Sequence, residues 1–284
     1  MNPPLRTGII GLGIIGQRVA ACLHQKGFSP LVWNRTPKPE EPGWTDTPEE
    51  LARSCDVIQC LVTDGPALME VMEAMRPQLG PGKTILNCST ISLSDTTAAA
   101  ALVAKTGAVF LDVPFTGSRD AAAAGQLIYY AGGSREAIEA VRPILEASGK
   151  EIFLTGAIGT ATVLKIATNM VSSTIVGVLA EAMGVVAAQG IALTKFQAAL
   201  ERNAAASGVS RLKVPSMIAA DFTPHFSLKN MLKDASFALE LAGASGIQLP
   251  ILGTVAEGMA VMASNGHAED DYSVMASNYL PSRA

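Results

Sequence analysis

The first half of the chain alternates short apolar runs with stretches in which apolar and polar positions follow a helical period. The runs that we expect to form strands are Leu5–Ile10, Pro30–Asn34, Val57–Val62, Thr84–Asn87 and Val109–Asp112. Amphipathic stretches such as Gln17–Gln25 and Leu68–Met75 lie between them. This alternation predicts an α/β domain with a parallel, doubly wound sheet and helices on both of its faces.

One helix start is well defined in this half. In Thr47-Pro48-Glu49-Glu50 the threonine is a good N-cap residue and proline suits the first helical position. The glutamate three residues after the threonine can close a capping box. A helix is therefore expected to begin directly after Thr47.

The pattern changes after about Gly156. Strand signals stop, and sequence rich in Ala, Leu and Met continues with helical spacing, with breaks expected near Gly190, Pro215, Pro224 and Pro250. The stretch Ile166–Leu193 is very apolar, but Glu181 interrupts it before an uncharged run reaches the ~18 residues of a membrane span. We expect a long buried helix between two domains, which are residues 1–157 and an all-helical domain of residues 158–284.

Composition narrows the class of protein. Hydrophobic residues make up 49% of the chain and charged residues 16%, which excludes a disordered chain. The net charge of -4, with no cluster of lysine and arginine, argues against a nucleic-acid partner. No membrane partner is expected, so small molecules or a second copy of the chain are the expected partners.

The four cysteines show no metal-binding pattern. Cys22, Cys55, Cys60 and Cys88 lie in or beside apolar segments, without CxxC or Cys/His spacing, so no metal site is expected. The start of the chain, Met1-Asn2-Pro3-Pro4, has neither the basic nor the apolar region of an export signal. These features predict reduced, buried thiols in a cytoplasmic protein.

A glycine-rich fingerprint for dinucleotide binding follows the first expected strand. In Gly11-Leu12-Gly13-Ile14-Ile15-Gly16 the first glycine permits a tight turn, and the second lets the backbone approach a pyrophosphate. The third allows close packing of helix and strand, and the helix N-terminus then faces the phosphates. This strand–turn–helix context makes a nicotinamide dinucleotide the expected cofactor.

The end of the second expected strand indicates NADP rather than NAD. NAD-binding sites usually place Asp or Glu there, whereas this chain has Asn34-Arg35-Thr36, with Lys38 close behind. Arg35 can pair with a 2′-phosphate and stack on adenine, and Thr36 can donate a hydrogen bond. Leu61 and Val62, at the end of the third strand, are assigned to the same site.

Three further segments resemble those of a known family. They are Asp112-Val113-Pro114-Phe115-Thr116-Gly117-Ser118 running on to Gly125-Gln126-Leu127; Gly156-Ala157-Ile158-Gly159 followed by Lys165 and Asn169; and Phe226-Ser227-Leu228 followed by Lys233-Asp234. With the fingerprint, they resemble the β-hydroxyacid dehydrogenases, which include 3-hydroxyisobutyrate dehydrogenase. Ser118, where many relatives have a second glycine, is closer to the glyoxylate/succinic semialdehyde reductases. The resemblance implies an N-terminal Rossmann domain and an all-α C-terminal domain joined by a long helix.

The resemblance also implies a reaction. Such enzymes interconvert a small aldehyde or keto acid and its hydroxy acid with NADP(H). Lys165 would be the general acid that protonates the carbonyl oxygen, and Asn169, four residues on and on the same helix face, would orient it. A lysine in so apolar a helix is costly unless it serves a cavity, which supports this role.

Other roles are implied only by the resemblance. Thr116, Gly117 and Ser118 would hold a substrate carboxylate, with Phe226 as a wall of the pocket and Asp234 also at the substrate. Thr90 would lie near the nicotinamide, and Lys233 would contact the cofactor. Relatives assemble through the helical domain, so a homodimer or homotetramer is expected.

Two departures and two alternatives remain. Ala161 stands where the family usually has a third glycine, and Phe115 is bulkier than the usual residue. Imine reductases share the fold and the Asn-Arg-Thr sequence, but typically carry Asp or Tyr where Lys165 stands. Non-catalytic NADP-binding relatives often lose this lysine.

Overall fold

The computed structural model describes residues 5–280 of the chain. Its contacts divide the chain into two compact units, with the division between Lys165 and Ile166. The first unit contains two hydrophobic clusters, one on each face of its sheet, and the second contains one.

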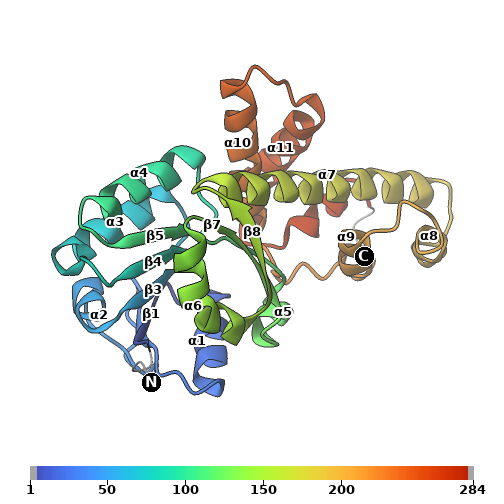
Figure 1. Cartoon of the computed structure of the whole chain (residues 1–284). Coiled ribbons are helices and arrows are strands. Elements are labelled where there is room, and N and C mark those ends of the chain that lie inside the picture. Colours follow the sequence, from blue (N-terminus) through green and yellow to red (C-terminus); the bar gives the residue numbers. More distant parts are fainter. Residues whose placement is uncertain (1–4, 281–284) are drawn as a thin grey trace. The chain divides into compact units, whose positions relative to one another are not determined.

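The first unit is built on an eight-stranded sheet in the order β2-β1-β3-β4-β5-β7-β6, with β8 paired to β7 (Figure 1). The strands are β1 Thr7–Ile10, β2 Leu31–Trp33, β3 Val57–Cys60, β4 Thr84–Asn87, β5 Val109–Asp112, β6 Phe115–Thr116, β7 Leu127–Gly132 and β8 Gly149–Gly156. The first five run parallel, which confirms the doubly wound α/β fold. β7 runs antiparallel to β5 and β6, so the sheet is mixed beyond the five expected strands.

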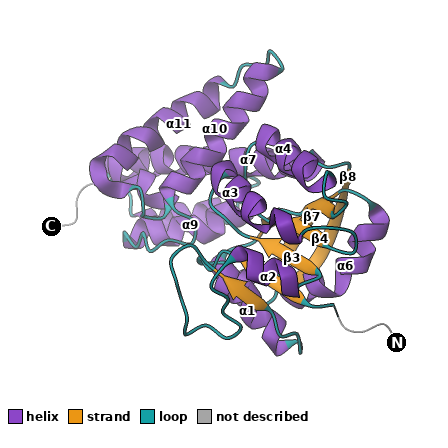
Figure 2. Ribbon diagram, turned by 90° about the vertical axis from the view of Figure 1, so that its left-hand side faces the viewer, coloured by secondary structure: helices purple, strands orange, loops and turns teal. Residues whose placement is uncertain are grey.

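Helices cover both faces of this sheet (Figure 2). They are α1 Gly16–Gln25, α2 Pro48–Ser54, α3 Gly65–Met75, the short η1 Arg76–Gln78, α4 Leu93–Ala104, α5 Arg119–Ala123 and α6 Arg135–Ser148. Residues of α1, α5 and α6 pack in the cluster on one face, and residues of α2, α3 and α4 pack in the cluster on the other. Both amphipathic stretches expected from the sequence are helical.

Helix α2 begins directly after Thr47, as expected, but its capping box is not closed. The Thr47 side chain accepts a hydrogen bond from the Glu50 N–H at 3.1 Å. The Glu50 carboxylate accepts from the Asp46 N–H at 3.2 Å, one residue before the cap. The expected reciprocal bond to Thr47 is therefore wrong, because the glutamate reaches past the cap.

Apart from an isolated β-bridge between Ser227 and Asp271, the described residues of the second unit are helical or in connecting loops (Figure 1). Its helices are α7 Thr160–Ala188, which begins in the first unit, α8 Leu193–Leu200, α9 Gly208–Ala219, α10 Leu228–Ala244, α11 Pro250–Met262, the π-helical η2 Ala263–His267 and the 3₁₀-helical η3 Tyr272–Asn278. Breaks occur near Gly190 and Pro224, and Pro250 starts α11. The break expected at Pro215 is wrong: this proline lies inside α9, where the flanking Val214 and Met217 are buried.

Helix α7 is less buried than the sequence indicated. Val171, Val178 and Val185, seven residues apart, are 53%, 55% and 66% exposed. Within residues 5–280 this is the one helix long and apolar enough to cross a membrane, a test that core helices of soluble proteins also pass. The expectation of a long buried helix is wrong for this face, where these valines are exposed.

A buried ion pair joins α9 to the start of η3. The Lys213 ammonium lies 2.7 and 2.8 Å from the two carboxylate oxygens of Asp271, and both residues are almost wholly buried. Asp271 also accepts from the backbone N–H groups of His225 and Phe226, at 3.0 and 3.1 Å. Burial opposes ionisation of Asp271, but Lys213 and the bonds from Ser273 outweigh it and lower its pKa. The pair therefore fixes the loop that carries Phe226.

We predict that Lys213→Met lowers the free energy of unfolding at pH 7 by about 3–5 kcal/mol, because it leaves a buried carboxylate without a counter-charge. Since the folded pKa of Asp271 is lowered, the pair's contribution is present above about pH 4 and is lost as the pH falls through the folded pKa. In Lys213→Met the pKa of Asp271 rises, because the counter-charge is gone. The difference in free energy of unfolding between the variant and the unmodified protein should therefore narrow as the pH falls and the carboxyl is protonated. Urea unfolding across this pH range measures both effects.

The exposed pair Lys229–Glu269 provides the control. Lys229→Met should change the free energy of unfolding by less than about 1 kcal/mol. If Lys213→Met were equally mild, the buried pair would not stabilise this unit.

Candidate active site

The glycine-rich loop between β1 and α1 has the geometry that the fingerprint predicts. Gly11 has φ +97°, and a side chain there would overlap the Leu61 carbonyl. A side chain on Gly16 would overlap the Gly11 carbonyl, whereas at Gly13 the corresponding space is open. The first and third glycines are thus required by the protein itself, and the second leaves room beside the backbone.

The N-terminus of α1 is unusual among the helices of the first unit. Within its described residues, α2 to α6 each have a Thr, Asp or Ser side chain that caps the first turn. Helix α1 has neither a capping side chain nor an acidic residue in its first turn. The positive end of its dipole is therefore not compensated by a side chain of α1 and suits an anion.

Asn34 and Lys38 connect the loop after β2 to the glycine-rich loop. The Asn34 side chain accepts from the Leu12 N–H at 2.9 Å and donates to the Thr36 carbonyl at 2.8 Å. Lys38 Nζ donates to the Leu12 carbonyl at 3.1 Å. Both the N–H and the carbonyl of Leu12 are therefore hydrogen-bonded to side chains of the loop after β2, which joins the two loops.

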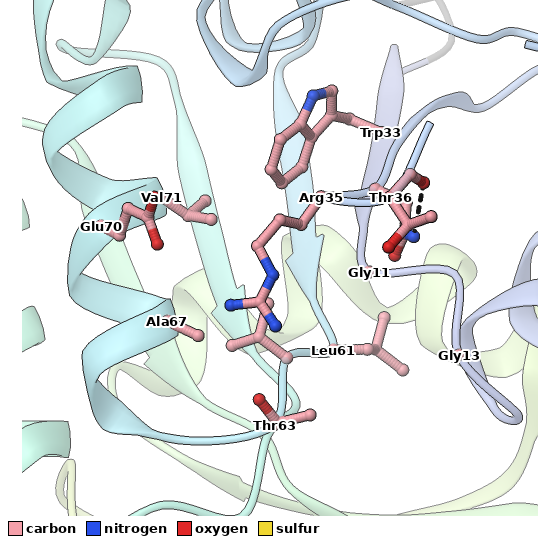
Figure 3. Close-up of a pocket in the computed structure, with 12 residues that line it drawn as sticks. Gly11, Gly13, Trp33, Arg35, Thr36, Leu61, Thr63, Ala67, Glu70 and Val71 are labelled. Atoms are coloured by element: carbon pink, nitrogen blue, oxygen red, sulfur yellow. Dashed lines mark hydrogen bonds between the residues drawn. The ribbon is translucent and has the colours of Figure 1, made fainter. Parts of the chain in front are cut away.

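A cavity of about 220 Å³ lies at the carboxyl ends of β1, β2 and β3 (Figure 3). Its walls contain the expected Gly11, Gly13, Asn34, Arg35, Thr36, Leu61 and Val62. The Arg35 side chain extends across the cavity toward Thr63. This is the edge where the strand order reverses at β1, the usual ligand crevice of doubly wound sheets.

Sequence reasoning missed Trp33, Thr63, Ala67, Glu70 and Val71, which also line this cavity. Two signals could have found them. Trp33 immediately precedes the strand-end asparagine. The other four follow β3, and Ala67, Glu70 and Val71 have the spacing of one face of the next helix.

The remaining residues assigned to the cofactor lie outside that cavity wall. Leu12 is buried, Ile14 is exposed, and Ile15 and Gly16 form the start of α1. Thr90 is half-buried after β4. Its neighbour Ser89, which the sequence did not single out, accepts from the Val62 N–H at 2.9 Å and so supports the cavity wall.

The thiols of the first unit are not poised for nucleophilic chemistry. All four cysteines are free and buried. Burial raises the pKa of Cys60 to about 12, and it raises that of Cys88 well above the ordinary value. They remain protonated at neutral pH.

Within residues 5–280 no group of three or more His, Cys, Asp or Glu is placed to hold a metal ion.

The segment assigned to the substrate turns between β6 and α5. Thr116 pairs with Ile128 of β7, and Gly117 has φ +140°. The Ser118 hydroxyl accepts from the Ala121 N–H at 3.2 Å and caps α5, which leaves its own proton available. The Phe115 ring packs edge-on against the Tyr129 ring, with 6.1 Å between the ring centres, so its bulk supports the sheet.

Lys165 and Asn169 both lie on α7, on adjacent turns. Lys165 is half-buried and Ala161, one turn earlier, is fully buried. In the second unit, Asn169 donates to a carboxylate oxygen of Asp234 at 2.6 Å. The other Asp234 oxygen lies 3.0 Å from the Lys233 ammonium. The structure thus brings Asn169, Lys233 and the wholly buried Asp234 together.

The Phe226 ring packs edge-on against the ring of Tyr272, with 6.3 Å between the ring centres. The Lys233 ammonium is also 5.0 Å from the centre of the Phe237 ring. Aromatic faces attract such a cation, so Phe237 is a neighbour of the site that the sequence did not indicate.

Comparisons with known sequences agree with this geometry. Residues 6–156 match the NAD binding domain of 6-phosphogluconate dehydrogenase. Residues 159–279 match the NAD-binding domain of NADP-dependent 3-hydroxyisobutyrate dehydrogenase. These two matches identify an oxidoreductase of the nicotinamide-dinucleotide class. Within that class, the chain belongs to the family of NAD(P)-dependent β-hydroxyacid dehydrogenases.

Similar proteins extend over nearly the whole chain. Glyoxylate/succinic semialdehyde reductase 2 of Arabidopsis thaliana is 28% identical, over 94% of this chain and 77% of its own length. The 2-hydroxy-3-oxopropionate reductase of Escherichia coli is 29% identical, over 95% and 96%. The structure of Mycobacterium tuberculosis 3-hydroxyisobutyrate dehydrogenase superposes with a TM-score of 0.89 at 24% identity, over 97% and 99%.

Two other similar proteins correspond to the alternative functions. A Streptomyces aurantiacus imine reductase shares the fold with a TM-score of 0.66 and 20% identity, over 97% of this chain and all of its own. Mouse cytokine-like nuclear factor N-PAC is 26% identical over 97% of this chain, which spans about half of that protein. The fold alone therefore does not select the reaction.

Proposed function

We propose that this protein is an NADP(H)-dependent enzyme that interconverts a small aldehyde or keto acid and its hydroxy acid. The observation that carries the proposal is the cavity at the ends of β1, β2 and β3, which Arg35 crosses and where no acidic residue ends β2. A ribose 2′-phosphate needs a cation at that point and no carboxylate at the end of β2; the carboxylate that lines this cavity, that of Glu70, lies on α3. Arg35 and Thr36 supply the 2′-phosphate contacts, and Arg35 also stacks on adenine.

The residues around the cavity fit a dinucleotide. The pyrophosphate would lie at the uncapped N-terminus of α1, beside Gly13, where the loop leaves open space. Leu61 and Val62 line the same crevice, and Thr90 and Lys233 are proposed as further cofactor contacts. Residues 1–157 then form the cofactor domain and residues 158–284 the helical domain.

When bound, the cofactor supplies hydride to the carbonyl carbon. Lys165 donates its proton to the carbonyl oxygen, and its positive charge stabilises the developing alkoxide. Asn169, fixed by Asp234, orients the lysine and the substrate. The backbone N–H groups of Thr116–Ser118 hold a substrate carboxylate.

Phe226 forms a wall of the substrate pocket, and Asp234 acts at the substrate end through Asn169. The substrates in the names of the plant and bacterial relatives are aldehyde acids, which favours this substrate class. An imine reductase is the alternative suggested by the shared fold. Lys165 favours carbonyl reduction, and it also argues against a non-catalytic module of the N-PAC type.

We propose that the protein is a cytoplasmic homo-oligomer, at least a dimer, built through its helical unit. Val171, Val178 and Val185 form an exposed apolar stripe along α7. Ile247 and Ile251, 59% and 66% exposed, add to the apolar surface of this unit. Surfaces of this kind are typical of association sites, and a second copy of the same surface can cover them.

NADPH should bind at least ~10-fold more tightly than NADH, which corresponds to about 1.4 kcal/mol and to one charge-assisted contact. Arg35→Ala should weaken NADPH binding by at least a similar factor and NADH binding by less, because NADH loses only the stacking on adenine. Fluorescence titration of both cofactors measures this, with Arg53→Ala, an exposed arginine on α2, as the control. Equal affinities in the unmodified protein would refute the NADP preference.

Lys165→Ala should reduce turnover by about 10²–10⁴-fold, the usual loss on removing a positioned general acid. NADPH affinity should change little, because Lys165 is not among the residues that line the cofactor cavity. Steady-state NADPH oxidation with glyoxylate, succinic semialdehyde, 2-hydroxy-3-oxopropionate and a cyclic imine tests both the role and the substrate class.

Lys195→Ala, at an exposed position on α8, is the control for this experiment and should retain full turnover. Turnover of Lys165→Ala within a few-fold of the unmodified enzyme would show that another group is the acid. Reduction of the imine alone would favour the alternative reaction.

Light scattering at micromolar concentration should show a dimer or a larger assembly. Val178→Glu should dissociate it, because it places a charge in the middle of the apolar stripe. Ala101→Glu, an exposed position on α4, should not change the mass. A monomeric mass for the unmodified protein would contradict the proposed assembly.

A further inference from the structure

A buried carboxylate at the end of β5 holds the first turn of α7. One Asp112 oxygen accepts from the Gly159 N–H at 3.0 Å and from the Thr162 N–H at 2.9 Å. The other oxygen accepts from the Thr162 hydroxyl at 2.8 Å. Asp112 is wholly buried, and these contacts satisfy N–H groups that the start of a helix leaves without an intrahelical partner.

The contact continues to a third segment. The Thr96 hydroxyl lies 3.0 Å from the Thr162 hydroxyl and 3.0 Å from the Ser92 carbonyl, and it can donate its single proton to either of them. The Ser92 side chain caps α4 through the Asp95 N–H at 3.0 Å. All of this lies within the first unit, and Thr96 and Thr162 are as buried as Asp112.

The network joins three places in the chain to which the proposed function assigns chemistry. Asp112 immediately precedes the segment that leads to Thr116–Ser118. Ser92 is two residues after Thr90, and Thr162 is one helical turn before Lys165. A hydrogen-bond network that joins the segments carrying Thr116–Ser118, Thr90 and Lys165 can set the relative positions of these segments.

The cost of this arrangement supports a specific role for the carboxylate. Burial raises the pKa of Asp112, although the hydrogen bonds from Thr162 and Gly159 act in the opposite direction. A buried carboxylate is costly unless its oxygens accept hydrogen bonds. Here both Asp112 oxygens accept hydrogen bonds, and they lie at the N-terminus of α7, where the helix dipole favours a negative charge.

We propose that Asp112 is a positioning residue that fixes the start of α7 and thereby the place of the Lys165 ammonium. The proposal rests on the proposed function, in which Lys165 is the proton donor. Asp112 itself contacts only protein groups in this network. Its effect on the reaction passes through the helix, because a shift of the first turn moves a side chain one turn later, and shifts of about 1 Å reduce rates strongly.

Three variants separate the interactions. Asp112→Ala removes all the acceptors, and turnover should fall by about 10–10²-fold with NADPH affinity within about 2-fold. Asp112→Asn should retain most of the turnover. Its amide oxygen can accept from both N–H groups, and its amide nitrogen can donate to a Thr162 hydroxyl that then donates to Thr96. Thr162→Val removes only the hydroxyl contact and should have a smaller effect, and it provides a test if Asp112→Ala does not fold.

Two readouts distinguish positioning from general damage. In the Lys165→Ala background, Asp112→Ala should reduce turnover by less than about 2-fold further, because both changes act on the same step. Hydrogen exchange of residues 157–168 should be faster in Asp112→Ala, and in Thr162→Val to a lesser degree, than in Asp112→Asn.

Each contrary result has a defined meaning. Unchanged exchange in Asp112→Ala would overturn the capping role, and so would equal losses of turnover in Asp112→Ala and Asp112→Asn. Losses that multiply in the double variant would overturn positioning through Lys165. Full turnover in Lys165→Ala alone would overturn the proposed role of Lys165 as the acid and the link from Asp112 to that lysine, while the exchange measurement would still decide whether Asp112 holds the helix.

Discussion

The hydrogen bonds of one buried carboxylate fix the first turn of α7 within the first unit. Asp112 ends β5 inside the first unit, where an ionised oxygen without donors would be very costly. The N–H groups of Gly159 and Thr162 provide those donors, so α7 must begin beside β5. Residues almost fifty positions apart become neighbours, and the position of Lys165 follows from where the helix begins.

A second constraint, steric rather than electrostatic, shapes the cofactor crevice. Gly11 and Gly16 leave no space for side chains because backbone carbonyls occupy it. Asn34 then holds Leu12 through its side chain, and the loops after β1 and β2 become one wall. In NAD-binding sites an acidic residue at the end of β2 binds the ribose. Here Asn34 stands at that place and its side chain is hydrogen-bonded to the glycine-rich loop, so Arg35 supplies the charge at the cavity.

The second unit depends on charges that are paired away from water. Lys213 and Asp271 fix the loop before α10, and Asp234 holds Asn169 and Lys233. The polar residues that the family resemblance singled out thus have protein partners of their own. The apolar surface of α7 has no comparable cover within the described chain, which is why assembly is proposed for this unit and not for the sheet.

Local pattern determined much of this protein: the five parallel strands, the fingerprint loop, the start of α2 after Thr47 and the helical second half all follow from neighbouring residues. The family motifs identified Lys165, Asn169 and Asp234 as candidates. Only the tertiary structure decided that Asp112 caps α7, that Trp33 and Glu70 line the cavity and that α9 continues through Pro215. Those features depend on which distant groups a residue meets, because burial and hydrogen-bond partners are set by packing and not by adjacent sequence.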